Sequence, residues 1–127
     1  MPRATLSNRI ATRFSLRTNG CNRWVLLTRR RAFKFPAPTG WRNFLYGLLN
    51  NLNEAESSRK EGACPVLWRL PGGLLNVMPR ADELTDQEFS ALNVSLFCDR
   101  NGLVVEYKRD SFGMLDGKIV AVDYGWP

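Results

Sequence analysis

Three charged residues far apart in the chain are of types that together can bind a phosphate-bearing ligand: Lys34, Glu54 and Asp123. Lys34 stands between two phenylalanines in a strand-like segment, and Glu54 lies late in a segment of helical periodicity. A lysine on a sheet can pair with a glutamate on a packed helix, which fixes the ammonium against phosphates. Asp123 ends an apolar strand-like run before a glycine turn, where a carboxylate can hold a divalent cation that bridges phosphates.

Each of these residues also has a simpler interpretation. Lys34 can be an outward-facing lysine on a basic surface, and Glu54 a solvated residue of its helix. Asp123 can merely end its strand. Both interpretations stay open at the level of the sequence.

The elements that must position these residues predict an α+β fold, with an antiparallel sheet of about five strands and one main packed helix. Asn19-Gly20 between two strand-like runs is a strong hairpin signal. The expected elements are three strands within 9–36, a helix over about 41–59, a hairpin over 66–78, a short helix at the Thr85-x-x-Glu88 capping box, and a C-terminal hairpin around Asp116-Gly117.

Large apolar side chains recur at helical spacing in the segment that follows Trp41, namely Phe44, Leu45, Leu48, Leu49 and Leu52. This period of about 3.6 residues predicts the helix. The four tryptophans at positions 24, 41, 68 and 126 are expected to pack in the core or at its rim.

From about residue 23 to residue 125, the order of these features resembles the protein-kinase-like fold, in particular the small kinase-related proteins of bacteriophages. Ala32-Phe33-Lys34 resembles the strand lysine motif, and Glu54 its helix partner. Residues 74–80 resemble the hinge, and Asp123-Tyr124-Gly125 the metal-binding Asp-Phe-Gly motif. We therefore expect a single truncated kinase-like domain over 1–127, with a sheet-plus-helix lobe over 9–78 and a reduced second part over 79–127.

The resemblance implies that Lys34, Glu54, Met78 and Asp123 contact a nucleotide, with Asp123 also a metal ligand. ATP and magnesium are the possible cofactors that it suggests.

Several departures from the family pattern argue against an active enzyme. The glycine-rich phosphate loop is missing, and the chain leaves no room for an activation segment or a lobe that binds peptide substrates. Glu106 stands where the catalytic aspartate belongs, and Ser111 where the metal-ligating asparagine belongs. A carboxylate displaced by roughly an ångström costs about 100-fold in rate. Glu106 and Asp110 are the candidate catalytic residues, and a shifted register would bring in Asp110 or Asp116.

The charges divide the chain into a basic front and a mildly acidic remainder. The first 53 residues hold ten Arg and Lys and no Asp or Glu. Such a segment suits an anionic partner, although a solvated basic face is the simpler alternative. The residues expected to bind the partner are Arg9, Arg13, Arg17, Arg29, Arg30 and Arg31. In an alternating strand, Arg9, Arg13, Arg17 and Arg29 would share one cationic face of the sheet.

The composition also restricts the chemistry and the location. The chain has no histidine, which excludes histidine-based catalysis and most zinc or copper sites. Its three cysteines are far apart and odd in number, which favours a reducing cytoplasm, here that of a host cell. No apolar run is long enough to span a membrane. Residues 1–31 also have the composition of a transit peptide, but their strand-like pattern favours a folded segment.

These observations favour a phage or prophage accessory protein on a degenerate kinase-like scaffold. Its basic N-terminal face would bind and modulate a host protein or nucleic-acid complex. The alternative is a nucleotide-binding minimal kinase or phosphotransferase that uses Lys34, Glu54 and Asp123. A third possibility is a component of a larger assembly such as a virion.

Overall fold

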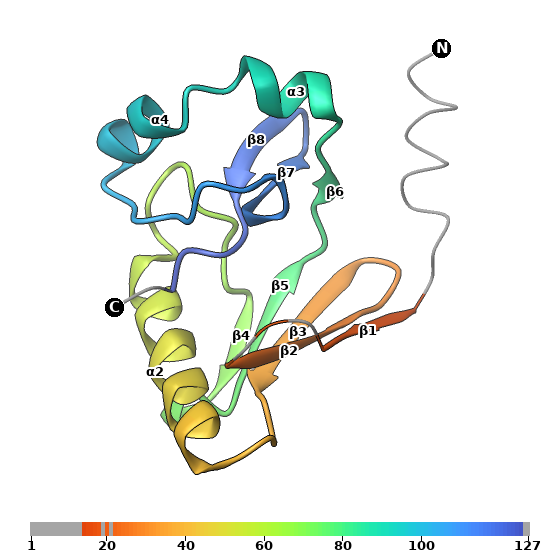
Figure 1. Ribbon diagram of the computed structural model, residues 1–127, viewed down its shortest axis with the longest axis vertical. Helices are drawn as coiled ribbons and strands as arrows, with labels where there is room; N and C mark the ends of the chain where they lie inside the picture. Colours follow the sequence, from red (N-terminus) through yellow and green to blue (C-terminus); the bar gives the residue numbers. More distant parts are fainter. Residues whose placement is uncertain (1–13, 19, 21, 126–127) are drawn as a thin grey trace.

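The computed structural model describes residues 14–18, 20 and 22–125, which form two antiparallel sheets with helices packed on them (Figure 1). The expected α+β class is confirmed. The elements are β1 (Ser15–Arg17), β2 (Arg23–Leu27), β3 (Arg31–Pro36), α2 (Trp41–Ser57), β4 (Trp68–Leu70), η1 (Pro71–Gly73), β5 (Leu75–Pro79), β6 (Asp82–Glu83), α3 (Asp86–Ala91), α4 (Val94–Asn101), η2 (Arg109–Ser111), β7 (Phe112–Leu115) and β8 (Lys118–Ala121).

Sheet A has five strands in the order β1-β2-β3-β5-β4, and α2 packs against it (Figure 1). In β3 the buried positions alternate, so Ala32 and Lys34 point to the same covered face. Lys34 is paired in register with Val25 on β2 and with Asn76 on β5, near the centre of the sheet. The sheet therefore turns the Lys34 side chain toward the helix and away from solvent.

Helix α2 begins after Gly40, and the face that it turns toward the sheet carries a glycine and polar residues rather than large apolar ones. Its buried residues are Gly47, Asn51 and Glu54. A Cβ atom at Gly47 would lie 2.3 Å from the carbonyl oxygen of Asn22, so only glycine permits this close approach of helix and strand. The approach brings Asn51 and Glu54, one and two turns further on, against the strands of sheet A.

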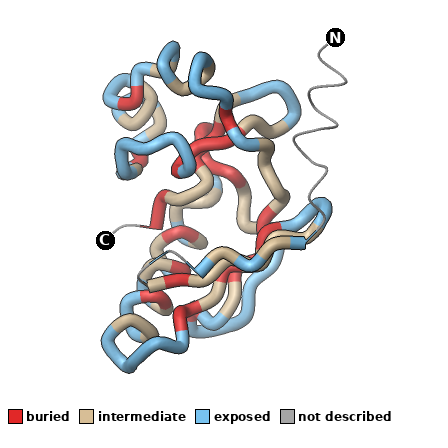
Figure 2. Tube along the Cα trace, turned by 45° about the vertical axis from the view of Figure 1, so that its right-hand side comes forward, coloured by how far each residue is buried: buried red, intermediate tan, exposed pale blue. Residues whose placement is uncertain are grey.

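Sheet B, in the order β6-β7-β8, lies in the other half of the molecule beside α3 and α4 (Figure 1). Its C-terminal hairpin turns at Asp116-Gly117, where both residues have positive φ, as the sequence predicts. The main apolar core lies in this half, and Figure 2 shows its buried segments in red. Core side chains that link the two halves include Met78 of β5 and Tyr124 after β8.

Several elements differ from the sequence prediction. The strand expected from residue 66 begins at Trp68, and an additional helix, α4, ends at its C-terminal cap Gly102. Residues 82–83, which lie between the expected hairpin over 66–78 and the helix at Thr85, form β6 and pair with β7. The first strand was expected from residue 9, but residues 9–13 lie outside the described ranges.

The expected burial of the tryptophans is wrong for two of them, because Trp41 is 80% exposed and Trp68 is 57% exposed. Trp24 is half-buried against Phe35, and Trp126 lies outside the described residues. Among the described residues, none of the helices has the length and apolar character needed to cross a bilayer.

Candidate functional site

Lys34 and Glu54 form a buried ion pair between β3 and α2. The Lys34 Nζ lies 3.0 Å from Glu54 Oε1 and 3.1 Å from Oε2, and it also donates to the backbone carbonyl of Val122. The Glu54 side chain is fully buried, and that of Lys34 is 7% exposed. The pairing of a sheet lysine with a helix glutamate is therefore confirmed, and the solvated interpretation of both residues is wrong.

Arg23 is the central residue of the site, and the sequence analysis did not single it out. Its guanidinium donates to both carboxylate oxygens of Glu54, at 2.9 and 3.2 Å, and to Asp123 Oδ1 at 2.6 Å. A further bond of 3.0 Å reaches Asn51 Oδ1. Arg23 thus joins α2 to the end of β8, two segments that are about 70 residues apart in the chain. Its position beside Trp24 does not distinguish it in the sequence, because Arg42 and Arg69 also stand beside a tryptophan.

The two cations decide the protonation of Glu54. Burial raises the pKa of this carboxyl, but the charges and hydrogen bonds of Arg23 and Lys34 outweigh burial and lower the pKa to about 2. The backbone N–H of Tyr124 donates to Glu54 Oε2 at 3.1 Å. Burial alone would lower the pKa of Arg23, but Glu54 and Asp123 raise it above its ordinary value. The site is therefore a network of fixed charges.

Two asparagines connect the network to the backbone around it. Asn51 Nδ2 donates to the carbonyl oxygens of Lys34, at 3.0 Å, and Gly73, at 2.9 Å. Asn76 Nδ2 donates to the carbonyl oxygen of Asn51 at 2.9 Å. All three side-chain bonds lie in the interior, so they fix the height of α2 above β3 and β5.

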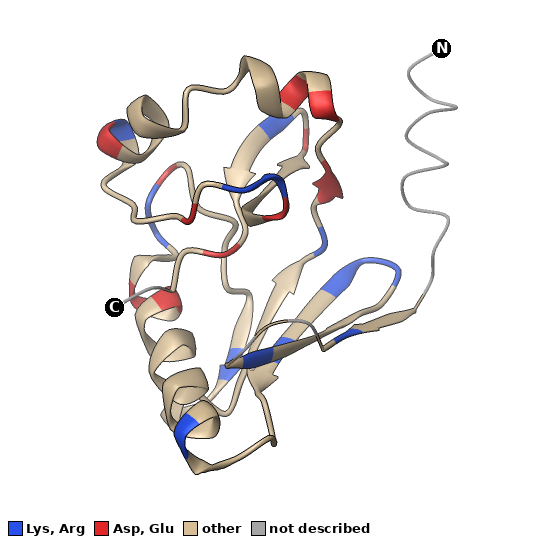
Figure 3. Cartoon of the chain, in the orientation of Figure 1, with Lys and Arg blue, Asp and Glu red and all other residues tan. Residues whose placement is uncertain are grey.

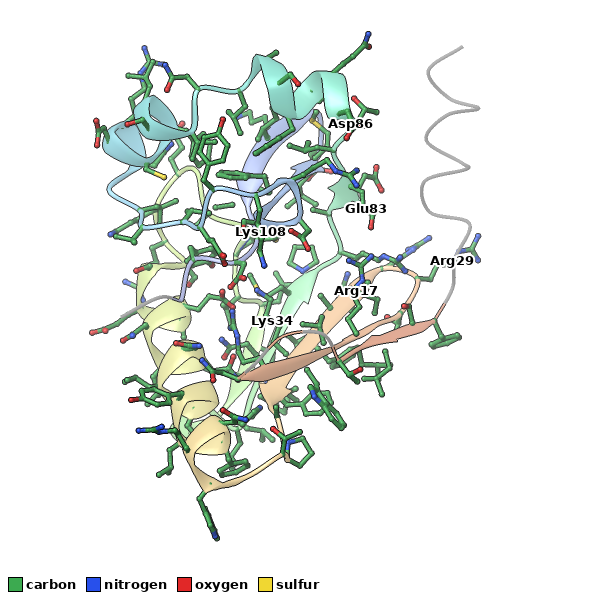
Figure 4. All side chains as sticks on the ribbon, viewed as in Figure 1. Arg17, Arg29, Lys34, Glu83, Asp86 and Lys108 are labelled. Carbon is green, nitrogen blue, oxygen red and sulfur yellow. The ribbon has the colours of Figure 1, made fainter. Side chains whose placement is uncertain are left out.

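The charged network forms part of the floor of a cleft of about 430 Å³ between the two sheets. Lys34, Arg23, Met78 and Asp123 line one side of it, and the segment 106–110 lines another. In Figure 4, Lys34 and Lys108 lie on opposite sides of the space between sheet A and the upper half. Met78 is 1% exposed and contributes an apolar wall. Three of the four residues expected to contact a nucleotide, Lys34, Met78 and Asp123, therefore line the cleft, whereas Glu54 does not line it and lies buried beneath Lys34.

Asp123 is the most accessible acidic group of the network, with a side chain that is 36% exposed. Its Oδ1 atom is held by Arg23. No group of three or more Cys, Asp or Glu side chains arranged to hold a metal occurs in the described part of the chain. The residues do not fit a resident metal ion. A magnesium ion that arrives with a nucleotide needs only one or two protein carboxylates, and Asp123 can supply one.

The candidate catalytic residues lie at the cleft without the contacts of a catalytic pair. Glu106 and Asp110 both line the cleft and are exposed. Glu106 makes an exposed ion pair of 3.5 Å with Lys108. Ser111 is fully buried, and its Oγ atom has no hydrogen-bond partner among the described residues. Asp116 lies in the exposed β7–β8 turn.

The predicted cationic strand face is only partly described, because Arg9 and Arg13 lie outside the described ranges. Arg17 on β1 pairs with Glu83 on β6 at 2.6 Å, and this hydrogen bond is the main cause that lowers the pKa of Glu83. Arg29 and Arg30 lie in the β2–β3 turn, so they do not follow a strand alternation.

These two arginines and Arg31, at the start of β3, are all exposed; we call the three the basic turn. Figure 3 shows these residues in blue where β2 leads through the turn into β3. The basic turn is therefore a compact cationic tip rather than a broad face of the sheet.

Comparisons of the chain with protein-family models, curated proteins and solved structures give no match.

Proposed function

We propose that the cleft between the two sheets binds a nucleotide or a closely similar phosphate-bearing small molecule, without efficient phosphotransfer. The observation that carries the proposal is that Lys34 and Asp123 line one cleft, where the buried Glu54 holds Lys34 from beneath. A lysine held by a helix glutamate, with an accessible carboxylate nearby, is an arrangement that can bind phosphates and their magnesium ion.

The charges in the cleft support a ligand that brings its own cation. Arg23 and Lys34 are balanced by Glu54 and Asp123, so the floor of the cleft carries no net charge. A bare polyphosphate would face Asp123 directly, whereas a magnesium-bound one would present a cation to it. The apolar Met78 wall suits a planar base or another apolar group.

Two residues in or beside the segment that lines the opposite wall, Ser111 and Glu106, differ from the kinase pattern, and both differences favour ligand binding over turnover. Ser111 is buried and cannot take the place of a metal ligand in the cleft. Glu106 is engaged with Lys108 on the surface. A displaced base costs about 100-fold in rate, so we expect little phosphotransfer even when nucleotide is bound.

The test is a thermal-shift measurement with magnesium-ATP on the wild type and on Asp123→Asn. A ligand at 100 times its dissociation constant stabilises by about 2.7 kcal/mol, which is an easily measured rise in Tm. We expect the rise in wild type and its loss in Asp123→Asn, where Arg23 still holds Glu54 through two hydrogen bonds. Asp99→Asn, on the exposed surface of α4, is the matched control and should keep the rise.

Two results would contradict the proposal in different ways. No shift in the wild type at any concentration of magnesium-ATP rules out nucleotide binding in the cleft. A shift that survives Asp123→Asn removes Asp123 from the site while leaving nucleotide binding in place.

A second function is favoured by the exposure of the basic turn. We propose that Arg29, Arg30 and Arg31 bind an anionic host component, as expected of a phage or prophage accessory protein. Three neighbouring arginines at the tip of a hairpin can contact successive phosphates of a nucleic acid, or an acidic protein surface.

Fluorescence anisotropy with a double-stranded DNA probe tests this function. Each phosphate that the protein neutralises adds about −0.9 to the slope of log affinity against log salt. Replacing all three arginines by alanine should therefore make this slope less negative by about three. A matched triple variant at the exposed residues Arg59, Arg69 and Arg100 should change it less. Affinity that does not depend on salt excludes nucleic acid, and polyglutamate is then the probe for an acidic protein surface.

A further inference from the structure

Helix α2 turns polar residues toward the protein interior and leaves much of its apolar side exposed. The residues that it buries are Gly47, Asn51 and Glu54. Four of its large apolar side chains are exposed instead: Trp41 is 80% exposed, Leu45 57%, Leu49 41% and Leu52 40%, whereas Phe44 and Leu48 are half-buried. The charged network explains why the inner side is polar. Nothing within the described chain covers the outer side, whereas the apolar side of a helix is normally buried.

The four exposed residues form one continuous stripe, which we call the α2 outer stripe: Trp41, Leu45, Leu49 and Leu52. Their spacings of four, four and three residues place them on one side of the helix. The stripe continues onto the neighbouring segment, because a Cβ atom at Gly73 would lie 2.3 Å from the carbonyl oxygen of Leu48. Beside that contact, Leu70 and Leu74 are 38% and 49% exposed. Contiguous apolar surface of this kind marks an interaction site.

Charged residues at the two ends of the stripe indicate what covers it. Arg42 and Glu56 are both exposed, and each is seven residues from Leu49. A heptad spacing keeps three residues close to one line along a helix. Figure 3 shows the corresponding blue first turn and red last turns of α2. A basic end, an apolar centre and an acidic end at equal distances are complementary to the same helix running in the opposite direction.

We propose that a second copy of this chain packs antiparallel on the α2 outer stripe, with the two-fold axis at Leu49. In this arrangement Leu49 meets its own copy, and Arg42 meets Glu56 of the second copy in two symmetric ion pairs. A parallel arrangement would bring like charges together at both ends. Two-fold interfaces are self-complementary, and this stripe has that property in both its apolar and its charged residues.

Sedimentation equilibrium over a series of concentrations tests the proposal. The wild type should change from the monomer mass of 14.5 kDa toward twice that value as concentration rises. Leu49→Glu should remain monomeric, with a Tm equal to that of the wild type at concentrations where the wild type is itself monomeric, because Leu49 is already 41% exposed in the monomer. Leu96→Glu is the matched control, since Leu96 is 47% exposed on another helix, and it should associate as the wild type does.

A charge exchange tests the antiparallel arrangement. Each single variant, Arg42→Glu or Glu56→Arg, replaces both intermolecular ion pairs by pairs of like charge. Each should therefore weaken association by roughly fivefold to tenfold. The double variant R42E/E56R should restore wild-type association. A wild type that stays at the monomer mass at every concentration overturns the dimer. Association that the double variant fails to restore overturns the antiparallel arrangement.

Discussion

Replacing Glu54 by glutamine is the most direct test of the charged network. Glutamine keeps the size of the side chain and its acceptor oxygen, but it removes the negative charge that holds Lys34 and Arg23. Both cationic side chains are almost fully buried, with exposures of 7% for Lys34 and 9% for Arg23, and Arg23 would keep only Asp123 as an ionic partner. Breaking a buried ion pair by removing one partner costs about 3–5 kcal/mol, because an uncompensated charge remains in the interior.

The pKa of Glu54 leads to a similar magnitude. The shift from 4.5 to about 2 corresponds to about 3 kcal/mol of stability at neutral pH. Because the pKa is lowered on folding, the unfolded chain binds the proton first as the solution is acidified. This contribution is therefore complete above about pH 4.5 and is lost as the pH falls toward 2.

Urea unfolding at a series of pH values measures both effects. A domain of this size has only about 5–15 kcal/mol of stability, so wild type and variant are compared with an equal concentration of a stabilising osmolyte. Glu54→Gln should lose about 3–5 kcal/mol at pH 7 and should lack most of the wild-type decline between pH 4.5 and 2.

Lys34→Met is the comparison variant, and it should cost less, because Glu54 keeps both hydrogen bonds from Arg23. A Glu54→Gln protein that loses less than about 1 kcal/mol, or that keeps the acid-dependent decline, would refute the account of the network, because removal of a buried ionic partner costs several times that amount.

Two further predictions concern local packing and capping. Gly73→Ala should destabilise far more than Gly72→Ala: both residues have positive φ, but a Cβ at Gly73 would lie 2.3 Å from the Leu48 carbonyl oxygen, whereas nothing lies within 4 Å at Gly72. Equal losses of unfolding free energy for the two variants would contradict this packing. Thr85→Ala removes the acceptor for the Glu88 N–H and should cost about 1 kcal/mol, whereas Thr85→Ser should be nearly neutral, as thermal unfolding would show.

Features that depend on neighbouring residues were predictable from the sequence. The capping box of Thr85 and Glu88 forms as expected, with both of its hydrogen bonds. The Asp116-Gly117 turn closes its hairpin, because these residues accept positive φ at little cost. Helix α2 ends within two residues of the predicted boundary. Helix α4 was missed because its apolar pattern is weak, although Asn93 and Gly102 carry the signals of its two caps.

In the functional site, the sequence indicated the pairing of Lys34 with Glu54 but gave no sign of the role of Arg23. Lys34 stands out because it lies between two phenylalanines in a strand-like segment, and Glu54 because it lies late in a segment of helical periodicity. Arg23 is one of ten basic residues in the first 53, and its carboxylate partners lie 31 and 100 positions further along the chain. Contacts over such separations depend on how the two halves close on each other, which local pattern does not determine.

Helix α2 shows which features the local sequence determines and which ones the tertiary structure determines. The spacing of Phe44, Leu48 and Leu49 by itself determined that residues 41–57 form a helix, because a period of 3.6 is a property of the local chain. Only the tertiary structure decided which side of that helix is buried. The close approach at Gly47 and the buried charges of Arg23 and Lys34 draw Glu54 inward, since a carboxylate with two cationic partners is more stable there than in isolation. The leucine side is consequently left facing outward.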